Sequence, residues 1–480
     1  MSKFFKALFS LLTAAVVSVS AMALPAAAAD TSKTAQQAVD DMGAGWNLGN
    51  AFDASDCSWL SNEMDYESAW NGEKTTKELI KAVKDMGFKT IRIPVSWHNH
   101  VDKNCNISSA WMKRVKTVVQ WCLDEDMYVI LNTHHDISAG CIYPDNAHYA
   151  QSEKYIKAIW KQLSAEFKDT GDKLIFESMN EVRAVGTNNE WWFDKNNIPK
   201  NVQEYISCIN KLNQAFVDTV RAGGGKNATR FLMIPGYATS TDGITNKYFT
   251  MPTDTAKDKL MVTVHIYTEK SSEYQSLINA AYNKFTAKGI PVVIGEFGTV
   301  IKTDAKKRAE IEGATAAYAR SKGMIVVRWD NNAFTGNTDS YGLIDRKTLK
   351  WKFEDIAKAI VKNSAGKSSV SAPSSSSSSS ASAKPASDKL TLTAAKASSD
   401  SIRFTWNKAD TAYGYRIYVY DSAKKGYVSC VTLSNGSSST LGYTMKDLKK
   451  GTYKYVIAPI YKNGNTITRG DISSSVSVTL

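Results

Sequence analysis

Two short stretches of the 480-residue sequence decide the fold: LIFESMNE at residues 174–181 and PVVIGEFG at residues 291–298. Each is an apolar, β-branched run typical of a buried strand, and each leads into a glutamate, Glu181 in the first and Glu296 in the second. Similar runs recur along the chain, each followed by roughly 10–18 residues with helical periodicity. The order therefore predicts alternating strands and helices.

The strand candidates share polar or aromatic residues at their carboxyl ends. They end at Trp46-Asn47, Arg92-Ile93-Pro94, Asn132-Thr133-His134, Asn180-Glu181, Ile234-Pro235, His265-Ile266-Tyr267, Gly295-Glu296 and Arg328-Trp329. Helices are expected between them, for example over residues 76–86, where Gly87 stops the helix, and over residues 111–123. Eight such units predict an α/β fold of the (β/α)₈ TIM-barrel type. A doubly wound sheet is the competing architecture, but it would rarely place such residues after nearly every strand.

Glu181 and Glu296 follow the fourth and seventh predicted strands. Barrel enzymes build their sites at the carboxyl ends of the strands, so both side chains are expected to point across one mouth. Two facing carboxyl groups suit cleavage of a glycosidic bond, because one donates a proton to the leaving oxygen and the other attacks the sugar carbon or activates water. A lone glutamate after a strand more often forms a surface salt bridge or a helix cap. Here two occur together, and other strand ends supply Arg92, His134 and Tyr267.

Short motifs are spaced along residues 40–355. They are IRIP at 91–94, NTHHD at 132–136, NE at 180–181, HIY at 265–267, GEFG at 295–298 and Trp329. In this order and spacing the set resembles glycoside hydrolase family 5, a family of retaining β-glycanases. GWNLGN at 45–50 and ESAW at 67–70 look like the family's subfamily 4. That likeness implies chiefly endo-β-1,4-glucanase activity, with xyloglucan, mixed-linkage glucan or xylan as further substrates.

The resemblance also implies roles for the two carboxyl groups. Glu181 would be the general acid/base and Glu296 the nucleophile. Arg92 and Tyr267 would contact Glu296 and favour its ionised form by charge and hydrogen bonding. A second carboxyl within about 5.5 Å of that anion, Glu181, should then stay protonated, as a general acid must. The expected reaction is double displacement with retention of configuration.

Further side chains are expected to bind the sugar. The resemblance implies that Asn180 holds the 2-hydroxyl and that Trp329 forms a stacking floor. It implies that His134 and His265 position hydroxyls or the acid/base. Weaker candidates are His135, Asn47, Trp191 and Trp192, the last two in a polar loop predicted to border the cleft. Looser candidates for outer sugar subsites are Trp46, Trp59, Trp70 and Trp97. Two histidines on separate strands near Asp136 are weak evidence for a metal, so neither a metal nor another cofactor is expected.

The sequence predicts four segments. Residues 1–29 have two lysines, an apolar run and AAA at 27–29, which is the layout of a cleaved secretory signal peptide. A membrane anchor is the alternative, but the apolar run is short and interrupted by serine and threonine. Residues 30–363 would form the catalytic domain. Residues 364–388 are rich in serine, which predicts a flexible linker.

The last segment, residues 389–480, alternates apolar and polar residues in about seven short runs, which predicts a β-sandwich. It resembles a fibronectin type III module through Trp406 on an early strand and LKKGTY at 448–453. It shows no catalytic constellation, so we expect it to serve as a spacer or as an adhesion module. Its basic surface could favour an acidic cell envelope.

The net charge of +12 lies mostly outside the predicted catalytic domain. From Lys367 onward there are 15 Lys and Arg against 6 Asp and Glu, and the signal segment adds further lysines. The large domain is therefore close to neutral and holds 11 of the 12 tryptophans, which suits an uncharged, ring-shaped ligand. Because the basic residues of the tail are dispersed, nucleic-acid binding is not expected.

These observations predict a secreted, retaining endo-β-1,4-glucanase that acts on cellulose-type β-glucans. It would be a monomer, extracellular or associated with the cell surface, and not a membrane protein. The alternatives are a xyloglucanase, mixed-linkage glucanase, xylanase or mannanase with the same machinery. A non-catalytic polysaccharide-binding protein should have lost Glu181 or Glu296. The six cysteines lack zinc spacing, and export would permit a disulfide such as Cys57 with Cys105.

Overall fold

The computed structural model describes residues 33–300, 304–336, 339–365, 390–409, 412–422, 426–434, 440–463, 466–470 and 472–480. The predicted signal peptide and most of the predicted linker lie outside the described residues. Helix α10 (Glu354–Ser364) reaches the first residue assigned to the linker, Ser364, which is buried.

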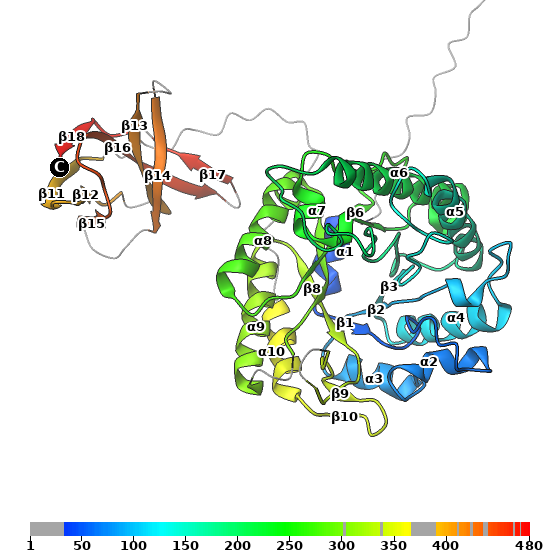
Figure 1. The fold of residues 1–480 in the computed structure, drawn as a ribbon. Helices are drawn as coiled ribbons and strands as arrows, with labels where there is room; N and C mark the ends of the chain where they lie inside the picture. Colours follow the sequence, from blue (N-terminus) through cyan, green and yellow to red (C-terminus); the bar gives the residue numbers. More distant parts are fainter. Residues whose placement is uncertain are drawn as a thin grey trace, which may run out of the picture. The chain divides into compact units, whose positions relative to one another are not determined.

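Eight parallel strands close into a barrel in chain order (Figure 1). They are β1 (Gly45–Leu48), β2 (Thr90–Ile93), β3 (Tyr128–Asn132), β4 (Leu174–Glu177), β5 (Leu232–Pro235), β6 (Leu260–Ile266), β7 (Val292–Phe297) and β8 (Ile325–Asp330). Closure comes from β1, which pairs with β2 on one side and with β8 on the other. The predicted (β/α)₈ barrel is therefore confirmed.

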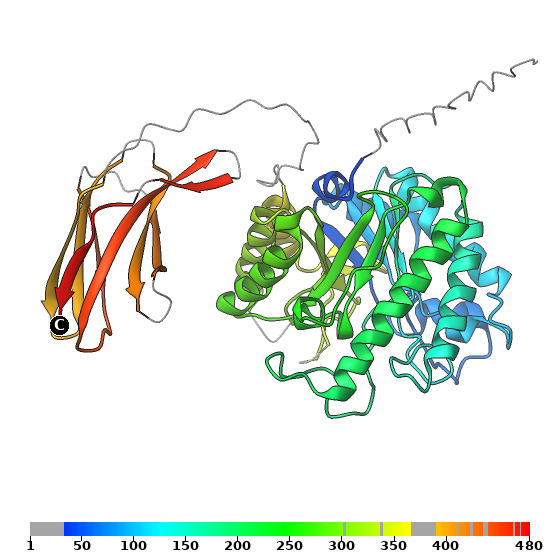
Figure 2. The same ribbon diagram turned by 90° about the horizontal axis from the view of Figure 1, so that it is seen from above.

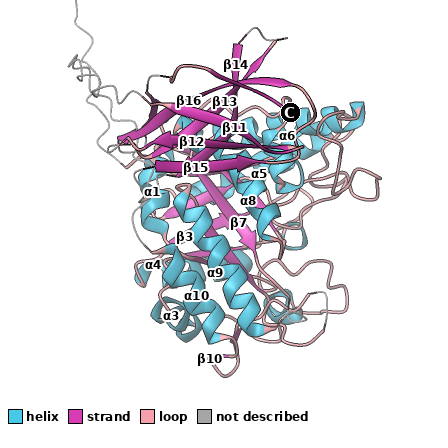
Figure 3. Cartoon of the chain, turned by 90° about the vertical axis from the view of Figure 1, so that its left-hand side faces the viewer, coloured by secondary structure: helices cyan, strands magenta, loops and turns pink. Residues whose placement is uncertain are grey.

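Helices surround the barrel strands (Figure 1). The α-helices are α1 (Ala35–Met42), α2 (Tyr66–Ala69), α3 (Lys77–Asp85), α4 (Ser109–Asp124), α5 (Tyr149–Glu166), α6 (Lys200–Ala222), α7 (Thr241–Thr245), α8 (Ser271–Lys284), α9 (Ala305–Ser321) and α10. The short 3₁₀ helices are η1 (Glu63–Asp65), η2 (His98–His100), η3 (Gly225–Ala228), η4 (Tyr237–Thr239) and η5 (Thr286–Lys288). Helices α9 and α10 lie side by side (Figure 3).

Local sequence explains the ends of α3. The side chain of Thr76 accepts a hydrogen bond from the backbone N–H of Leu79 (3.1 Å), which caps the first turn. Gly87, just past the helix, adopts a φ of 107°, a left-handed conformation that favours glycine. The helix predicted over residues 76–86 is thus correct to within one residue at each end.

Helix α1 covers the amino end of the barrel, where it is the blue helix in Figure 2. Its apolar residues Ala35, Ala38, Val39 and Met42 pack with side chains from inside the barrel. Those side chains are Tyr128, Ile130, Ile175, Phe231, Met233, Met261, Val293, Ile325 and Val327. The amino end is therefore an apolar plug, and the opposite end is left to carry polar groups.

Strand β4 is shorter than the sequence predicts. It ends at Glu177, four residues before Glu181, although the Ser178 N–H still donates to the carbonyl of Met233 (3.1 Å). On the other side of the barrel, the register between β6 and β7 shifts between Val264 and His265. A β-bulge of this kind re-aims side chains and is common beside active sites.

The region after residue 389 consists of strands. They are β11 (Leu392–Ser398), β12 (Ser401–Asn407), β13 (Gly414–Asp421), β14 (Gly426–Ser434), β15 (Thr440–Met445), β16 (Thr452–Asn463), β17 (Thr466–Arg469) and β18 (Val476–Thr479). One sheet has the order β11-β12-β15, and the other has the order β14-β13-β16-β17 with β18 also paired to β16. A small hairpin, β9 (Ile344–Asp345) with β10 (Lys350–Trp351), belongs to the first part of the chain.

The two C-terminal sheets share one apolar core. Phe404 and Trp406 of the first sheet cluster with Tyr415, Ile417 and Tyr455 of the second. Buried residues alternate with more exposed ones along the strands, so the inner faces of the two sheets form the core of the predicted β-sandwich.

Two further expectations concern cysteines and membranes. All six cysteines are free, so the suggested Cys57–Cys105 disulfide is wrong, and both of these thiols are buried. In the part of the chain that the structure describes, no helix has the length and apolar character of a membrane span.

Candidate active site

Arg92 on β2 is the centre of the polar network inside the carboxyl end of the barrel. Its guanidinium is fully buried and donates from Nε to Glu177 Oε2 (2.7 Å) and from one terminal nitrogen to Glu296 Oε1 (2.8 Å). The same nitrogen donates to Asn47 Oδ1 (2.9 Å), and the other donates to Asn180 Oδ1 (2.8 Å). Arg92 is thus fixed by four partners, a geometry suited to holding a carboxylate in place.

Glu296 lies on β7 and receives two donors. Arg92 binds Oε1, and the hydroxyl of Tyr267 donates to Oε2 at 2.9 Å. His265 Nδ1 is 3.5 Å from the same Oε2. Gly295 allows this packing, because a Cβ there would lie 2.6 Å from Thr263 Oγ1. Both oxygens of Glu296 are therefore engaged, as expected for a carboxylate held for attack along one direction.

Glu181 faces Glu296 across the mouth of the barrel. His265 Nδ1 lies 2.7 Å from Glu181 Oε1. One side-chain atom from each of Glu181, His265 and Glu296 lies within 4.8 Å of the others. Carboxyl groups about 5–5.5 Å apart are typical of retaining glycosidases, whereas inverting enzymes separate theirs by about 6.5–9.5 Å.

The surroundings of the two carboxyl groups separate their ionisation. Burial raises the pKa of Glu181 to about 7, and the charges of Arg183 and Arg92 only partly oppose that rise. Burial also raises the pKa of Glu296, and a charge on Glu181 would raise it further, but Arg92 and the Tyr267 hydroxyl act in the opposite direction. Because Glu296 has a direct ion pair and a hydroxyl donor, it ionises first, and Glu181 keeps its proton.

His265 carries no charge in this setting. Burial lowers its pKa to about 4, and the attraction of Glu296 does not compensate. A neutral imidazole beside Glu181 can orient that carboxyl without adding a positive charge that would force it to ionise. The arrangement therefore preserves the protonated form of Glu181 near neutral pH.

The predicted sugar-binding residues lie around this pair. Asn180 precedes Glu181, is almost fully buried, and has its carbonyl hydrogen-bonded by the hydroxyl of Thr239. His134 follows β3, and its ring is parallel to Trp329 of β8, with centroids 5.7 Å apart and an interplanar angle of 3°. The structure thus brings residues that lie in or just after strands β2, β3, β4, β6, β7 and β8 to one end of the barrel.

The profile of cellulases of glycosyl hydrolase family 5 matches residues 52–335. The chain belongs to glycosyl hydrolase family 5. Endoglucanase A of Clostridium longisporum is 37% identical over 352 residues, which are 69% of this chain and 66% of that protein. The chain therefore aligns with slightly less than two thirds of that relative.

Solved structures of this family have the same barrel. A family 5 lichenase from Caldicellulosiruptor sp. F32, solved as a mutant in complex with cellotetraose, is 43% identical, with a TM-score of 0.67 over 70% of this chain and 96% of that one. A GH5-4 broad-specificity endoglucanase from Ruminococcus champanellensis with bound cellotriose is 39% identical, with a TM-score of 0.64 over 68% and 98%. Both likenesses cover the barrel portion of this family 5 chain.

Asn47 does not have the substrate-binding position suggested by the sequence. It is fully buried, and its amide nitrogen donates to the carbonyls of Gly295 (2.9 Å) and Val327 (3.2 Å). Its oxygen accepts from Arg92, so the side chain is fully used in orienting that guanidinium.

Two of the looser tryptophan candidates are also corrected. Trp46 and Trp97 are fully buried in the apolar core that the barrel strands share with helix residues such as Val83 and Val115, because alternation along β1 puts Trp46 on the face opposite that of Asn47. Trp59 and Trp70 are exposed, and the ring of Trp70 lies 5.6 Å from that of His135. His135 is about one third exposed and packs edge to face against His134.

Trp191 and Trp192 are exposed in the loop after β4. The guanidinium carbon of Arg183 lies 3.7 Å from the centre of the Trp191 ring. Arg183 also donates to the backbone carbonyl of Glu181 (3.0 Å) and pairs with Glu190 (3.1 Å). Trp191 is therefore linked to the acid/base candidate through Arg183, whereas the backbone carbonyl of Trp192 accepts a hydrogen bond from Asn189 (3.4 Å).

A second cluster, Asp53 with His134 and His135, has side-chain atoms close enough for a metal. The hydrogen bonds of Asn132 and His134 argue against a metal at this cluster. The Val95 N–H donates to Asn132 Oδ1 (3.1 Å), so the Asn132 amide nitrogen faces His134 Nδ1 (3.2 Å). An amide nitrogen only donates, so Nδ1 accepts and Nε2 carries the proton. That Nε2–H is free to donate to a hydroxyl group, whereas both oxygens of the buried Asp53 already accept from the backbone N–H groups of Asn50 and Ala51.

Sequence reasoning missed Glu177, Arg183 and Thr263. Glu177 is a charged residue inside the apolar run LIFES, and a charge at a buried strand position requires a partner. This charge in an apolar run is the sequence feature that could have identified Glu177. No such feature marks Arg183, whose contact depends on the path of a loop, or Thr263, whose contact depends on the missing side chain of Gly295.

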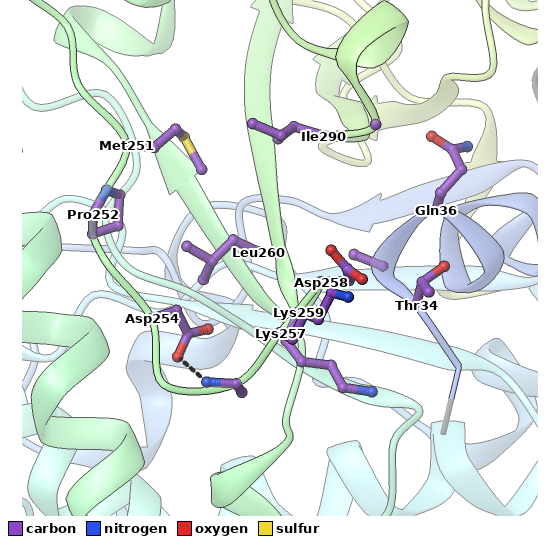
Figure 4. A pocket seen from close by; sticks show the side chains of 13 residues that line it. Thr34, Gln36, Met251, Pro252, Asp254, Lys257, Asp258, Lys259, Leu260 and Ile290 are labelled. Atoms are coloured by element: carbon purple, nitrogen blue, oxygen red, sulfur yellow. Dashed lines mark hydrogen bonds between the residues drawn. The ribbon is translucent and has the colours of Figure 1, made fainter. Parts of the chain in front are cut away.

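A cavity of about 270 Å³ lies at the other end of the barrel (Figure 4). It is lined by Thr34 and Gln36 at α1 and by residues just before β6 and β7, such as Lys257 and Ile290. Asp254 at its edge is already paired with Arg221 by two hydrogen bonds of 2.7 Å. Barrel enzymes place chemistry at the carboxyl ends of the strands, so this cavity is not assigned to catalysis.

Proposed function

We propose that this chain is an endo-β-1,4-glucanase that hydrolyses β-glucans by double displacement with retention. The observation that carries the proposal is the pair Glu181 and Glu296. The two carboxyl groups approach within 4.8 Å, yet only Glu296 is bound by Arg92 and Tyr267. One site therefore holds a protonated acid beside an ionised nucleophile.

In the first step, the Glu296 carboxylate attacks the anomeric carbon of the sugar. The bond to the leaving oxygen breaks as Glu181 donates its proton to that oxygen, which leaves a glycosyl ester on Glu296 and an ionised Glu181. Loss of the negative charge on Glu296 removes an anion that disfavours a charge on Glu181, so the pKa of Glu181 falls when a base is needed.

In the second step, Glu181 takes a proton from water as the water oxygen attacks the same carbon. The ester bond to Glu296 breaks, and both carboxyl groups return to their starting states. Asn180 would bind the 2-hydroxyl through its amide nitrogen, because its oxygen already accepts from Arg92. Trp329 and His134 would form the sugar-binding surface beside the scissile bond.

The preferred polymer is proposed from the relatives. The names endoglucanase, lichenase and broad-specificity endoglucanase all describe enzymes of β-glucans. Xyloglucan, xylan and mannan are alternatives, because the groups around Glu181 and Glu296 contact the reacting sugar and not the side branches of a polymer. Retention of both glutamates favours an enzyme over a protein that only binds polysaccharide.

The decisive experiment is a reducing-sugar assay of the purified chain on soluble cellulose derivatives, mixed-linkage glucan, xyloglucan, xylan and glucomannan. We expect the highest turnover on the β-glucans, and proton NMR of the initial products should show the β-anomer. Turnover confined to xylan or mannan would overturn the substrate, and initial α-anomer would overturn the retaining mechanism.

We also propose that the chain is secreted after removal of residues 1–29. The support is the charge and apolar layout of that segment. Sequencing the amino terminus of protein collected from culture medium tests it, and an intact Met1 would contradict it.

The C-terminal sheets are proposed to be a fibronectin type III-like spacer or adhesion module. The Tyr453 hydroxyl donates to the carbonyl of Lys449 (2.6 Å), a tyrosine-to-backbone bond also found in sandwiches of the immunoglobulin type. Removal of residues 366–480, after the end of α10, should leave turnover on a soluble glucan unchanged. A collapse in turnover would show that the module supports the barrel.

A further inference from the structure

Arg92 lies between two carboxylates and not one. Glu177 Oε2 accepts from Arg92 Nε (2.7 Å), and Glu296 Oε1 accepts from a terminal nitrogen of the same guanidinium (2.8 Å). Glu177 and Arg92 are both completely buried, and Glu296 nearly so. Charges in such surroundings are screened weakly, so each is felt strongly by its neighbours.

From this arrangement we propose that Glu177 is a positioning residue that sets the protonation of the catalytic pair through Arg92. The inference rests on the proposed function. Glu177 neutralises the positive charge of Arg92, so that Arg92 aligns Glu296 without drawing the proton from Glu181. With Glu177 uncharged, Arg92 would act on both catalytic carboxyl groups as an unbalanced cation.

The other charged and titratable groups at the pair do not take over this role. Glu296 faces His265 of β6 and Tyr267, the residue just after that strand, and Glu181 faces His265 and Arg183. His265 is neutral because burial lowers its pKa to about 4, and burial raises the pKa of Tyr267 well above its usual range. Arg183 is a second cation, which would add to the effect of Arg92.

The geometry also indicates that Glu177 is more than a structural anchor. Arg92 already has Asn47, Asn180 and Glu296 as acceptors, which engage both of its terminal nitrogens. What Glu177 adds is a second buried negative charge on Arg92, beside that of Glu296. Glu177 Oε1 is also buried and has no hydrogen-bond partner among the described residues, so this carboxylate is not optimised for stability.

The test is Glu177→Gln, which keeps the shape and an acceptor for Arg92 but removes the charge. We expect the basic limb of the pH profile of kcat/KM on soluble β-glucan to move to lower pH by about one unit, because the pKa of Glu181 falls. Activity at pH 8 should drop about tenfold more than activity at pH 5. A variant that lost only packing would lose activity equally at all pH values.

The matched control is Glu67→Gln. Glu67 is also a fully buried carboxylate bound by an arginine, since Arg114 donates to both of its oxygens (2.7 and 2.8 Å), but the pair makes no contact with Glu181 or Glu296. It should lower thermal stability and leave the basic limb in place. Movement of the limb in both variants would overturn the inference.

If Glu177→Gln does not fold, Arg92→Met tests the same charge balance. Glu177 then becomes the unbalanced charge, so the basic limb of the residual activity should move to higher pH, and adding Glu177→Gln should return it. A fixed limb in these variants, or in folded Glu177→Gln, overturns the role of Glu177. A wild-type chain without activity on any glucan would instead overturn the proposed function, and this inference with it.

Discussion

The two ends of the barrel are built from the same strands but have different roles: the amino end is an apolar plug, and the carboxyl end holds the polar site. On β3, β4 and β7, the residues Ile130, Ile175 and Val293 belong to the apolar plug closed by α1. Two positions further along β4, Glu177 joins the Arg92 network, and on β7 Gly295 makes room for it. Inward-facing side chains recur at every second residue of a strand. Two neighbouring inward-facing positions on one strand can therefore differ in role, one stabilising the fold and the next taking part in the chemistry.

The ends also differ in how they tolerate change. The amino end gains its stability from buried apolar surface, and each removed methylene leaves a cavity. The carboxyl end buries two carboxylates and an arginine, a costly arrangement that is stabilising only when every partner is present. Substitutions at one end should therefore change unfolding, and substitutions at the other should change turnover.

The largest effect is expected at the carboxyl end. Glu296→Gln should lower kcat/KM on soluble β-glucan by at least about 10⁴-fold, roughly 5.5 kcal/mol of transition-state stabilisation, because an amide cannot form the ester. The melting temperature should change by only a few degrees, since Arg92 keeps Glu177, Asn47 and Asn180. A reducing-sugar assay and thermal unfolding check both. Turnover above a tenth of wild type would contradict the assigned nucleophile.

The opposite pattern is expected at the amino end. Met42→Ala, at a fully buried position in the plug, should lower the free energy of unfolding by about 2–5 kcal/mol and leave kcat unchanged. Denaturant unfolding and the same activity assay measure the two quantities. Lys81→Ala on the exposed face of α3 is the control that should change neither. A large loss of kcat in Met42→Ala would mean that the two ends are coupled.

The pH dependence connects stability to chemistry. Burial raises the pKa of Glu181 to about 7, so the folded state binds its proton more tightly than the unfolded state does. Relative to Glu181→Gln, the wild type should lose stability as pH rises from about 4.5 to 7, by on the order of 2 kcal/mol, and the difference should vanish below pH 4. Turnover should fall above pH 7, when Glu181 loses the proton it donates.

Urea unfolding of both proteins at pH 4, 6 and 8 measures the stability difference. A difference that does not depend on pH would show that the pKa of Glu181 is not raised in the folded state.

The smallest effect is expected at the rim. Replacing Trp191 and Trp192 together with alanine should reduce kcat/KM on long glucans by about fivefold, roughly 1 kcal/mol, with little effect on an aryl cellobioside. The reason is that both rings are exposed, while Trp191 packs on Arg183 beside Glu181. Equal kinetics on long glucans would show that this loop does not contact the polymer.

Prediction from sequence worked where local pattern and chemistry coincide. Alternating strands and helices gave the barrel, and charged residues at strand ends gave Arg92, Glu181 and Glu296 as neighbours. It failed where the same local signal has two outcomes. Asn47 and Trp46 stand at the end of a strand that the sequence predicts as clearly as the strand of Trp329. Asn47 nevertheless donates to a backbone carbonyl, and Trp46 is buried in the core.

The sequence by itself determined the order of strands and the placement of two glutamates after the fourth and seventh of them, because hydrophobic periodicity and strand-end residues are local properties. Only the tertiary structure decided which carboxyl keeps its proton. That difference depends on burial and on side chains from four strands: Asn47 of β1, Arg92 of β2, Glu177 of β4 and His265 of β6. Electrostatic interactions depend on distances across the barrel, and no local pattern contains them.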